Sequence, residues 1–353
     1  MGRPTISLTK LRSHGLGTLA FWLADAVLFI FLFSGVLQAA DGSLPASPHP
    51  FLIVGHMGAP FEAPENTIES FKKAIELGAN AIETDICMTK DKYIVIWHDW
   101  APNSQLTLLR QLGRQGLKYR PFAPKLWEKA RKPVIELTLA ELRRNFGYTL
   151  RNAPGSGIHP AGTIPTLQEF CAWASGHDEL ERVFFDVKLP KERLDLLPPF
   201  FLRVRKILDT YDMTDKATLL IPRKEIAAEA VKQFGEGGPN YSFDQEIPTG
   251  MVINPKKFSA ANAAIALRTQ WASIGRPVLT FLGYPIFKKI VKSDLERIRL
   301  HNSGQPITPI EGYLVWTIDK PDEMKELMNM GVSGILTDRP DLLRQVFDGF
   351  KKH

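Results

Sequence analysis

Short apolar runs alternate with amphipathic stretches in the first half of the chain. Residues 51–54 form an apolar run that predicts a strand. Residues 66–77 place apolar side chains at helical spacing and end at Gly78, a helix stop signal. Residues 81–88 are rich in β-forming residues and predict a second strand. A strand, a helix and a strand in succession indicate a parallel α/β unit.

The same alternation continues towards the end of the chain. Thr138, with Glu141 three residues later, is typical of a capped helix over residues 135–146. The remaining runs predict strands at 183–188, 217–221, 241–253, 277–282, 312–319 and 331–338, and helices at 194–211, 224–234 and 321–330.

A turn at residues 89–92 joins the second strand to another β-rich run, 93–97, and predicts an antiparallel hairpin, because parallel strands need a long crossover. If the turn is centred within these four residues, Glu83 faces His98. Glu83 and Asp85 lie two apart on one strand and therefore point to the same face. The hairpin then brings two carboxylates and an imidazole together, whereas a one-residue slip would move His98 to the opposite face.

Residues 15–40 are mostly apolar, and Asp25 is their only formal charge. They follow the positive residues Arg3, Lys10 and Arg12, a pattern that predicts either a cleaved signal peptide or a retained membrane anchor over residues 1–40. Residues 41–50 are a linker rich in Pro and Ser. Either alternative predicts export, with the body of the protein outside the cytoplasm and a possible membrane association through residues 15–40.

Composition narrows the possible partners. The chain has 353 residues, long enough for one α/β barrel or two ordinary domains. Its net charge of +6 suits anionic phosphates or lipid headgroups, but no Lys/Arg cluster suggests nucleic acid. Residues 118–132 are basic with interleaved aromatics; they touch a lipid surface or form a solvated loop, and we favour the loop. The two cysteines, Cys87 and Cys171, form no recognisable disulfide framework, and we expect Cys87 to be buried.

Five short motifs follow one another between residues 56 and 99: His56-Met57-Gly58, Pro64-Glu65-Asn66-Thr67, Glu83-Thr84-Asp85, Thr89-Lys90-Asp91-Lys92 and His98-Asp99. They resemble the glycerophosphodiester phosphodiesterase family, in which the corresponding motifs are His-Arg-Gly, Pro-Glu-Asn-Thr, Glu-x-Asp, Thr-Lys-Asp-Gly and His-Asp. The resemblance covers roughly residues 51–190 and 311–345. In the turn motif, Lys92 replaces the family's glycine.

The resemblance implies a (β/α)8 TIM barrel over residues 51–353, with its site at the carboxyl ends of the strands. It also implies metal ligands at Glu83, Asp85 and Asp186. An all-oxygen ligand set favours one divalent cation, Ca²⁺ or Mg²⁺. Asp186 stands where the family has glutamate, so the ion would lie closer to that strand.

The remaining site residues are implied in the same way. His56 and His98 would be the general base and acid, and Lys188, Trp316 and Glu65 would contact the substrate. The resemblance then implies hydrolysis of a small or lipid-derived glycerophosphodiester to glycerol 3-phosphate and an alcohol.

Met57 replaces the arginine that the family uses to contact phosphate. Lys188 and the metal must then hold the phosphate charge alone, or a basic residue must reach in from another loop. We favour the first interpretation, because Arg110 and Arg114 lie in a weakly patterned segment with no evident route to the site.

Two alternative functions stay open. Expected export, a possible anchor and the unfamiliar segment 255–303 are compatible with a phospholipase D that acts on lysophospholipid or sphingomyelin. Met57 and Asp186 suggest instead a catalytically inactive binding barrel.

Overall fold

The computed structural model describes residues 50–350, apart from 154, 156, 191, 235–239, 246–257 and 277–282. The chain divides after Leu44, and all described residues belong to the second unit. The predicted signal or anchor over residues 1–40 therefore lies outside the described residues. Within the described part, no helix combines the length and the apolar character needed to cross a bilayer.

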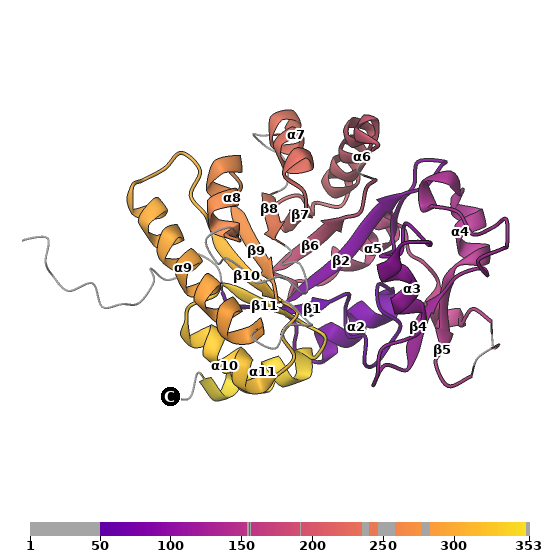
Figure 1. The fold of residues 1–353 in the computed structure, drawn as a ribbon, viewed down its shortest axis with the longest axis horizontal. Coiled ribbons are helices and arrows are strands. Elements are labelled where there is room, and N and C mark those ends of the chain that lie inside the picture. Colours follow the sequence, from indigo (N-terminus) through magenta and orange to yellow (C-terminus); the bar gives the residue numbers. More distant parts are fainter. Residues whose placement is uncertain are drawn as a thin grey trace, which may run out of the picture. The chain divides into compact units, whose positions relative to one another are not determined.

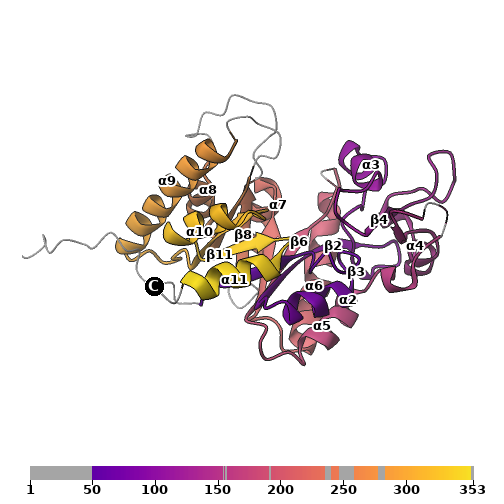
Figure 2. The ribbon, with the colours of Figure 1, turned by 90° about the horizontal axis from the view of Figure 1, so that it is seen from below.

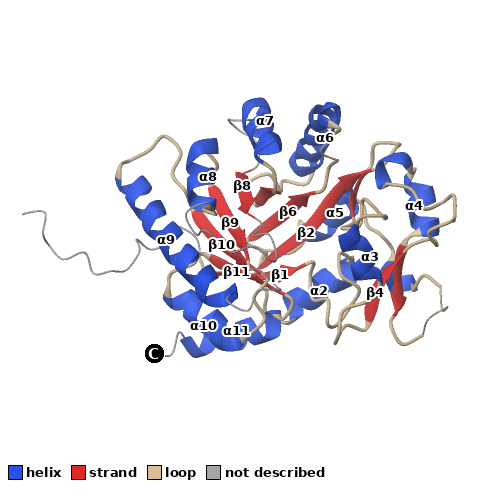
Figure 3. Ribbon diagram, viewed as in Figure 1, coloured by secondary structure: helices blue, strands red, loops and turns tan. Residues whose placement is uncertain are grey.

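Eight parallel strands close into a barrel in this unit (Figure 1). The first strand, β1, pairs with the last, β11, and also with β2, which closes the ring. Each strand is followed along the chain by a helix that packs outside the barrel (Figure 3). This is the predicted (β/α)8 fold.

The strands are β1 (Leu52–His56), β2 (Ala81–Met88), β6 (Arg182–Val187), β7 (Ala217–Ile221), β8 (Asn240–Gln245), β9 (Trp271–Gly275), β10 (Gly312–Trp316) and β11 (Gly334–Thr337). The helices are α2 (Ile68–Glu76), α5 (Leu167–Ala174), α6 (Leu197–Thr210, preceded by the 3₁₀ turn Leu194–Leu196), α7 (Lys224–Phe234), α8 (Ala260–Leu267), α9 (Gly283–Ser303), α10 (Pro321–Asn329) and α11 (Pro340–Phe350).

Apolar side chains from seven of the barrel strands form one buried cluster: Leu52, Val54, Ala81, Phe184, Leu220, Trp271, Leu314 and Leu336. The ring of Trp271 is fully buried and lies against Gly312, where a Cβ would come within 2.1 Å of the ring. Gly312 thus makes room for the largest side chain of the cluster. Filling the barrel in this way leaves its carboxyl-terminal mouth as the place for polar chemistry.

An insertion of about eighty residues separates β2 from its helix α5. It starts with β3 (Ile94–Ile96), which pairs antiparallel to β2, and continues with α3 (Gln105–Gln111). A two-stranded sheet follows, made of β4 (Tyr119–Phe122) and β5 (Gly147–Leu150), with 3₁₀ turns at Val134–Glu136 and Pro160–Gly162 and the helix α4 (Leu139–Asn145). Figures 1 and 2 show α3, β4 and α4 together on one side of the barrel. Because the insertion leaves from the carboxyl end of β2, it stands beside the mouth.

The hairpin register differs from the prediction by one residue. Ile86 pairs with Ile96 and Met88 with Ile94, so Glu83 does not face His98. The cause is a three-residue loop instead of a two-residue one, in which Lys92 adopts a left-handed φ of 69°. The strand β3 then ends before His98, so the loop after it, and not the hairpin ladder, places this histidine.

The segment between β7 and β10 departs most from the sequence patterns. The strand predicted at 241–253 begins as β8, and its remainder lies outside the described residues. The strand predicted at 277–282 also lies outside them. The barrel instead uses β9, a five-residue strand that we did not predict from its short apolar run. In the basic segment 118–132, four residues form β4 and most of the others are loop.

Candidate active site

Three carboxylates meet at the mouth of the barrel. Glu83 and Asp85 project from β2, and Asp186 lies opposite Asp85 on the neighbouring strand β6. Each offers an oxygen, and these oxygens all lie within 4.8 Å of one another. Glu83 and Asp85 are almost fully buried. Parallel pairing of β2 and β6 therefore assembles the acidic trio predicted from the sequence.

The trio has the character of a hard-cation site. Burial, followed by repulsion from the charge of Asp85, raises the pKa of Glu83 to about 8. Oδ1 of Asp186 is buried and has no hydrogen-bond partner among the described residues. Buried carboxylates need a partner, and an all-oxygen set suits Ca²⁺ or Mg²⁺. The residues present thus fit the predicted divalent ion.

Lys188 is the cation closest to the trio in the described structure. Its Nζ lies 2.5 Å from Oδ2 of Asp186 and 3.3 Å from Oδ1 of Asp85. Burial alone would lower its pKa, but Asp186 and Asp85 outweigh burial and raise it. Lys188 is therefore held charged beside the trio, with both neighbours fixed on the same sheet.

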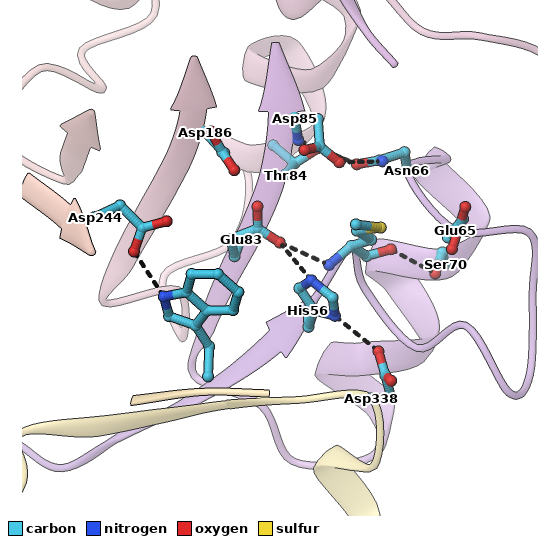
Figure 4. A network of polar contacts seen from close by, with 12 residues as sticks. His56, Glu65, Asn66, Ser70, Glu83, Thr84, Asp85, Asp186, Asp244 and Asp338 are labelled. Atoms are coloured by element: carbon cyan, nitrogen blue, oxygen red, sulfur yellow. Dashed lines mark hydrogen bonds and ion pairs between the residues drawn. The ribbon is translucent and has the colours of Figure 1, made fainter. Parts of the chain in front are cut away.

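His56 ends β1 and lies between two carboxylates (Figure 4). Its Nδ1 is 2.8 Å from Oδ1 of Asp338, and its Nε2 is 3.9 Å from Oε2 of Glu83. Burial would lower the pKa of this imidazole, but Asp338 and Glu83 outweigh burial and raise it to about 9. Asp338 directly follows β11, so closure of the barrel between β1 and β11 brings this pair together.

His98 has a carboxylate partner of its own. Its Nδ1 lies 2.7 Å from Oδ1 of Asp99. Burial, together with the charge of Arg110, holds the pKa of His98 well below its ordinary value, although Asp85 acts in the opposite direction. Both histidines thus feel the charge of the same acidic trio, and each has one ring nitrogen engaged by an aspartate.

Residues of the loop between β1 and α2 donate hydrogen bonds to two of the three carboxylates. The Nδ2 group of Asn66 donates to Asp85 at 2.7 Å, and its Oδ1 accepts from the hydroxyl of Thr84. The backbone N–H of Met57 donates to Oε2 of Glu83 at 3.0 Å, while the Met57 side chain is buried. Two of the three carboxylates are therefore oriented by a short loop whose sequence matched the family motifs.

Glu65 and Trp316, predicted to contact substrate, both have protein partners. Glu65 is buried and pairs with the guanidinium of Arg110. The indole Nε1 of Trp316 donates to Oδ1 of Asp244 at 2.6 Å, and its ring lies against Gly275. Substrate contact by either residue stays a prediction.

The interpretation that Arg110 and Arg114 have no route to the site is wrong. Nε of Arg110 lies 2.8 Å from Oδ1 of Asp99, the partner of His98. Arg114 reaches Oδ2 of Asp338, the partner of His56, at 2.6 Å. The insertion folds back over the mouth, so α3 and the loop after it deliver one arginine to each histidine–aspartate pair.

Sequence reasoning missed four residues of this site. Asp338 and Asp244 could have been found, because each lies at or just beyond the carboxyl end of a barrel strand, where side chains converge. Asp244 also accepts from the hydroxyl of Ser273, and burial followed by the charge of Asp186 raises its pKa to about 7. Arg110 and Arg114 carry no comparable signal, since their placement depends on how the insertion folds.

Comparison with known proteins agrees with this geometry. Two sequence profiles, both described as "Glycerophosphoryl diester phosphodiesterase family", match residues 56–221 and 314–341, and together they cover more than half of the chain. A glycerophosphodiester phosphodiesterase of Caldanaerobacter subterraneus subsp. tengcongensis is 25% identical over 83% of this chain and 96% of its own length. The resemblance therefore extends over nearly the whole relative.

Solved structures show the same fold. A Silicibacter pomeroyi protein, named as a glycerophosphoryl diester phosphodiesterase, superposes with a TM-score of 0.63 at 20% identity, over 87% of this chain and 96% of its own. An Oleispira antarctica phosphodiesterase, solved in complex with the product sn-glycerol-3-phosphate, gives a TM-score of 0.53 at 16% identity, over 84% and 96%. Taken with the matching motifs, these findings show that the chain belongs to the glycerophosphoryl diester phosphodiesterase family and is a phosphoric diester hydrolase.

Proposed function

We propose that this enzyme hydrolyses glycerophosphodiesters to glycerol 3-phosphate and an alcohol, with one Ca²⁺ or Mg²⁺ held by Glu83, Asp85 and Asp186. The observation that carries the proposal is the convergence of three carboxylates, two of them buried and one partly buried, with oxygens within 4.8 Å of one another, beside two histidines. Lone acidic clusters are common, but buried ones with imidazoles on hand suit phosphodiester chemistry. The glycerol 3-phosphate bound to the Oleispira relative supports the same product here.

The chain's own residues supply the proton transfers. When bound, the divalent ion would neutralise charge on the phosphoryl oxygens. Of His56 and His98, one takes the proton from the attacking group, a water or the glycerol hydroxyl, and the other gives a proton to the departing alcohol. Where the glycerol hydroxyl attacks, a cyclic diester forms, and water then opens it to glycerol 3-phosphate with the two proton transfers reversed. Asp338 and Asp99 each engage Nδ1, which leaves Nε2 of each ring for the substrate. Lys188 adds positive charge next to the phosphate, and the ring of Trp316 lines the pocket for the glycerol group.

Metal removal tests the proposal. Exhaustive chelation should abolish turnover of glycerophosphocholine, and Ca²⁺ or Mg²⁺, added in turn, should restore it. Calorimetric titration should show that Glu83→Gln binds the ion more weakly than the wild type, independently of any activity. Full turnover after exhaustive chelation would remove the metal assignment, whereas metal-dependent turnover of any phosphodiester would exclude an inactive binding barrel.

A second candidate substrate is a lysophospholipid, which the enzyme would cleave as a phospholipase D. Four leucines of α3, in the insertion that reaches the histidine–aspartate pairs, are exposed, and an acyl chain is the part of a lysophospholipid that such residues would contact. Headgroup release from lysophosphatidylcholine and from glycerophosphocholine, measured side by side, separates the two substrates.

We also propose that residues 1–40 direct export of the barrel. The apolar run behind a positive flank supports this. N-terminal sequencing of the exported protein would distinguish a cleaved signal, which starts near residue 41, from a retained anchor.

A further inference from the structure

The helix α3 is apolar on the side that faces solvent. Its four leucines, Leu106, Leu108, Leu109 and Leu112 (the last of them the C-cap), have exposed fractions of 55%, 37%, 65% and 70%, so none of them contributes to a core. On a helical wheel they occupy one side together with the exposed Gln105, and the polar Thr107, Arg110 and Gln111 occupy the other. A helix at the surface of a soluble domain normally shows the opposite arrangement.

The inner face of α3 is polar because it contacts residues of the active site. Arg110 uses the inner face of α3 to contact Glu65 and Asp99, and Gln111 accepts a hydrogen bond from Arg131. Polar side chains are needed inside, where the histidine–aspartate pair lies. Nothing in the described structure covers the leucines outside.

A neighbouring loop adds to the same surface. Leu126 and Trp127 are 65% and 78% exposed. Their loop is fixed to α3 by Arg131, a buried residue. Its guanidinium donates to the carbonyl oxygens of Pro102 and Pro124 and to the side chains of Asn103 and Gln111. The leucines of α3 and the tip of this loop, Leu126 and Trp127, are called the apolar rim below.

The segment that carries the apolar rim is rich in positive charge. Residues 100–135 contain eight basic side chains and one acidic one, Glu128, so the chain's whole excess of +6 arises within this segment. Five of the basic residues are exposed: Arg114, Lys118, Lys125, Lys129 and Lys132. An exposed apolar surface with a Trp and a basic border is the pattern of a protein that lies on an anionic membrane.

We propose that the apolar rim docks the enzyme onto an anionic lipid bilayer, with its leucines and Trp127 among the headgroups and the lysines around them on the lipid phosphates. A protein partner would also cover leucines, but the concentration of the chain's positive charge here favours a surface of uniform negative charge. Residues 125–129 are exposed, as expected for the solvated loop favoured from the sequence, and α3 with its C-cap supplies four of the six apolar side chains of the rim. One consequence, which rests on the proposed function, is that the rim presents the active site to phosphodiesters in or leaving the bilayer.

The fluorescence of Trp127 gives a direct test on the full chain. The protein has seven tryptophans, so the spectrum of Trp127→Phe is subtracted from that of the wild type. Vesicles of phosphatidylcholine with phosphatidylglycerol should shift the difference emission to the blue, because the indole leaves water. A protein that floats with these vesicles while its Trp127 emission stays unchanged would overturn the proposal, since residues 1–40 or another surface would then hold it.

Paired variants test the two components of the surface. Leu109→Ser/Leu112→Ser and Lys125→Gln/Lys129→Gln should each weaken the Trp127 response about tenfold or more in vesicle concentration. The lysine effect should disappear at high salt or on pure phosphatidylcholine. Matched controls are Leu202→Ser/Ile307→Ser, which alters leucine and isoleucine exposed by 64% and 98% elsewhere, and Lys289→Gln/Lys292→Gln on α9. Equal losses in the controls, or none in the rim variants, would refute the docking surface.

Kinetics separate this inference from the proposed function. Wild type and rim variants should hydrolyse soluble glycerophosphocholine equally, while anionic vesicles containing lysophospholipid should favour the wild type. If the wild type hydrolyses no diester, the proposed function fails, yet the Trp127 shift still decides the docking. A response to a lysate protein but to no vesicle would point to a protein partner and overturn the lipid assignment.

Discussion

Each histidine of the site contacts an aspartate through Nδ1, and each of these aspartates pairs with an arginine. His56, Asp338 and Arg114 form one such set of three residues, and His98, Asp99 and Arg110 form the other. A carboxylate that engages Nδ1 fixes both the tautomer and the orientation of the ring. The first set joins both ends of the barrel sequence to the insertion, and the second lies wholly within the insertion, yet the two have the same order of contacts.

The first prediction concerns the two histidines. His56→Ala and His98→Ala should each lower kcat for a glycerophosphodiester by about 10²-fold or more, the usual scale for general acid–base groups. The double variant should be little worse than the worse single variant, because residues that act as a unit are non-additive. Losses that multiply would show that the histidines act independently.

The second prediction concerns the phosphate charge. Arg114 is half exposed and has one carboxylate partner, Asp338, whereas Lys188 is 19% exposed and lies between two carboxylates. Guanidinium offers five N–H donors, so Arg114 can bind phosphate while it keeps Asp338. We expect Arg114→Ala to raise KM about tenfold with less change in kcat, and Lys188→Ala to lower kcat severely.

Arg193→Ala is the matched control for Arg114, since Arg193 is also about half exposed and paired with one aspartate, Asp195. An unchanged KM in Arg114→Ala would show that another cation holds the phosphate. Unchanged kinetics in Lys188→Ala would instead remove the role given to that lysine.

At the scale of single residues, the sequence predicted the positions of site residues on the barrel strands better than those in loops. Glu83, Asp85 and Asp186 were predictable because motif and strand period fix where each points. The register predicted for His98 was wrong, since the extra loop residue at Lys92 shifts the ladder, and its role in the site stays a prediction. Arg110 and Arg114 could not be placed, because their position depends on the tertiary fold of an irregular insertion.

At the scale of elements, α8 depends on a side chain from α9. Asp294 is buried and accepts from the hydroxyl of Ser259 at 2.5 Å, from the backbone N–H of Ala260 and Ala261, and from the hydroxyl of Tyr313 at 3.0 Å. It therefore caps the N-terminus of one helix from a neighbouring helix and also ties both to β10. Nothing in the local sequence of α8 reveals this, since the capping carboxylate lies more than thirty residues away.

The third prediction follows from this contact. Asp294→Ala leaves buried N–H and hydroxyl groups without an acceptor and should lower the free energy of unfolding by about 2–4 kcal/mol. Urea denaturation measures the loss. Asp322→Ala, at an exposed position of α10, should change the free energy of unfolding by about 0.5 kcal/mol or less. A change of about 0.5 kcal/mol or less in Asp294→Ala would contradict the stabilising role given to the Asp294 contacts.

At the scale of the whole molecule, the alternation of strand and helix patterns predicted a parallel α/β fold, and the family resemblance made that prediction a (β/α)8 barrel. The (β/α)8 order holds even where single predictions failed, as at β9. Barrel closure tolerates a missed strand in the prediction, because eight parallel strands and their helices are one of few solutions for such an alternating pattern. The insertion follows no repeat, and its arrangement was for that reason not predictable.

The fourth prediction uses the two thiols as probes of global unfolding. Cys87 lies in β2 and Cys171 in α5, both are buried, and they are the only cysteines of the chain. Burial raises the pKa of each thiol, so neither is a ready nucleophile. A thiol reagent should therefore label no cysteine in the native protein and two per chain in denaturant, and a reductant should leave the melting temperature unchanged. Rapid native labelling of either thiol would contradict this burial.

The pair formed by His56 and Asp338 has a consequence for the order in which the enzyme becomes competent. The two residues are 282 positions apart, so the imidazole leaves the ribosome long before its carboxylate partner is made. Contacts between such distant positions form late and slowly, because a long loop must close first. During refolding, helical signal should return before hydrolysis does, and any fragment that stops short of β11 should be inert even where its metal ligands are complete. Synthesis must therefore pass β11 and Asp338 before any phosphodiester is cut.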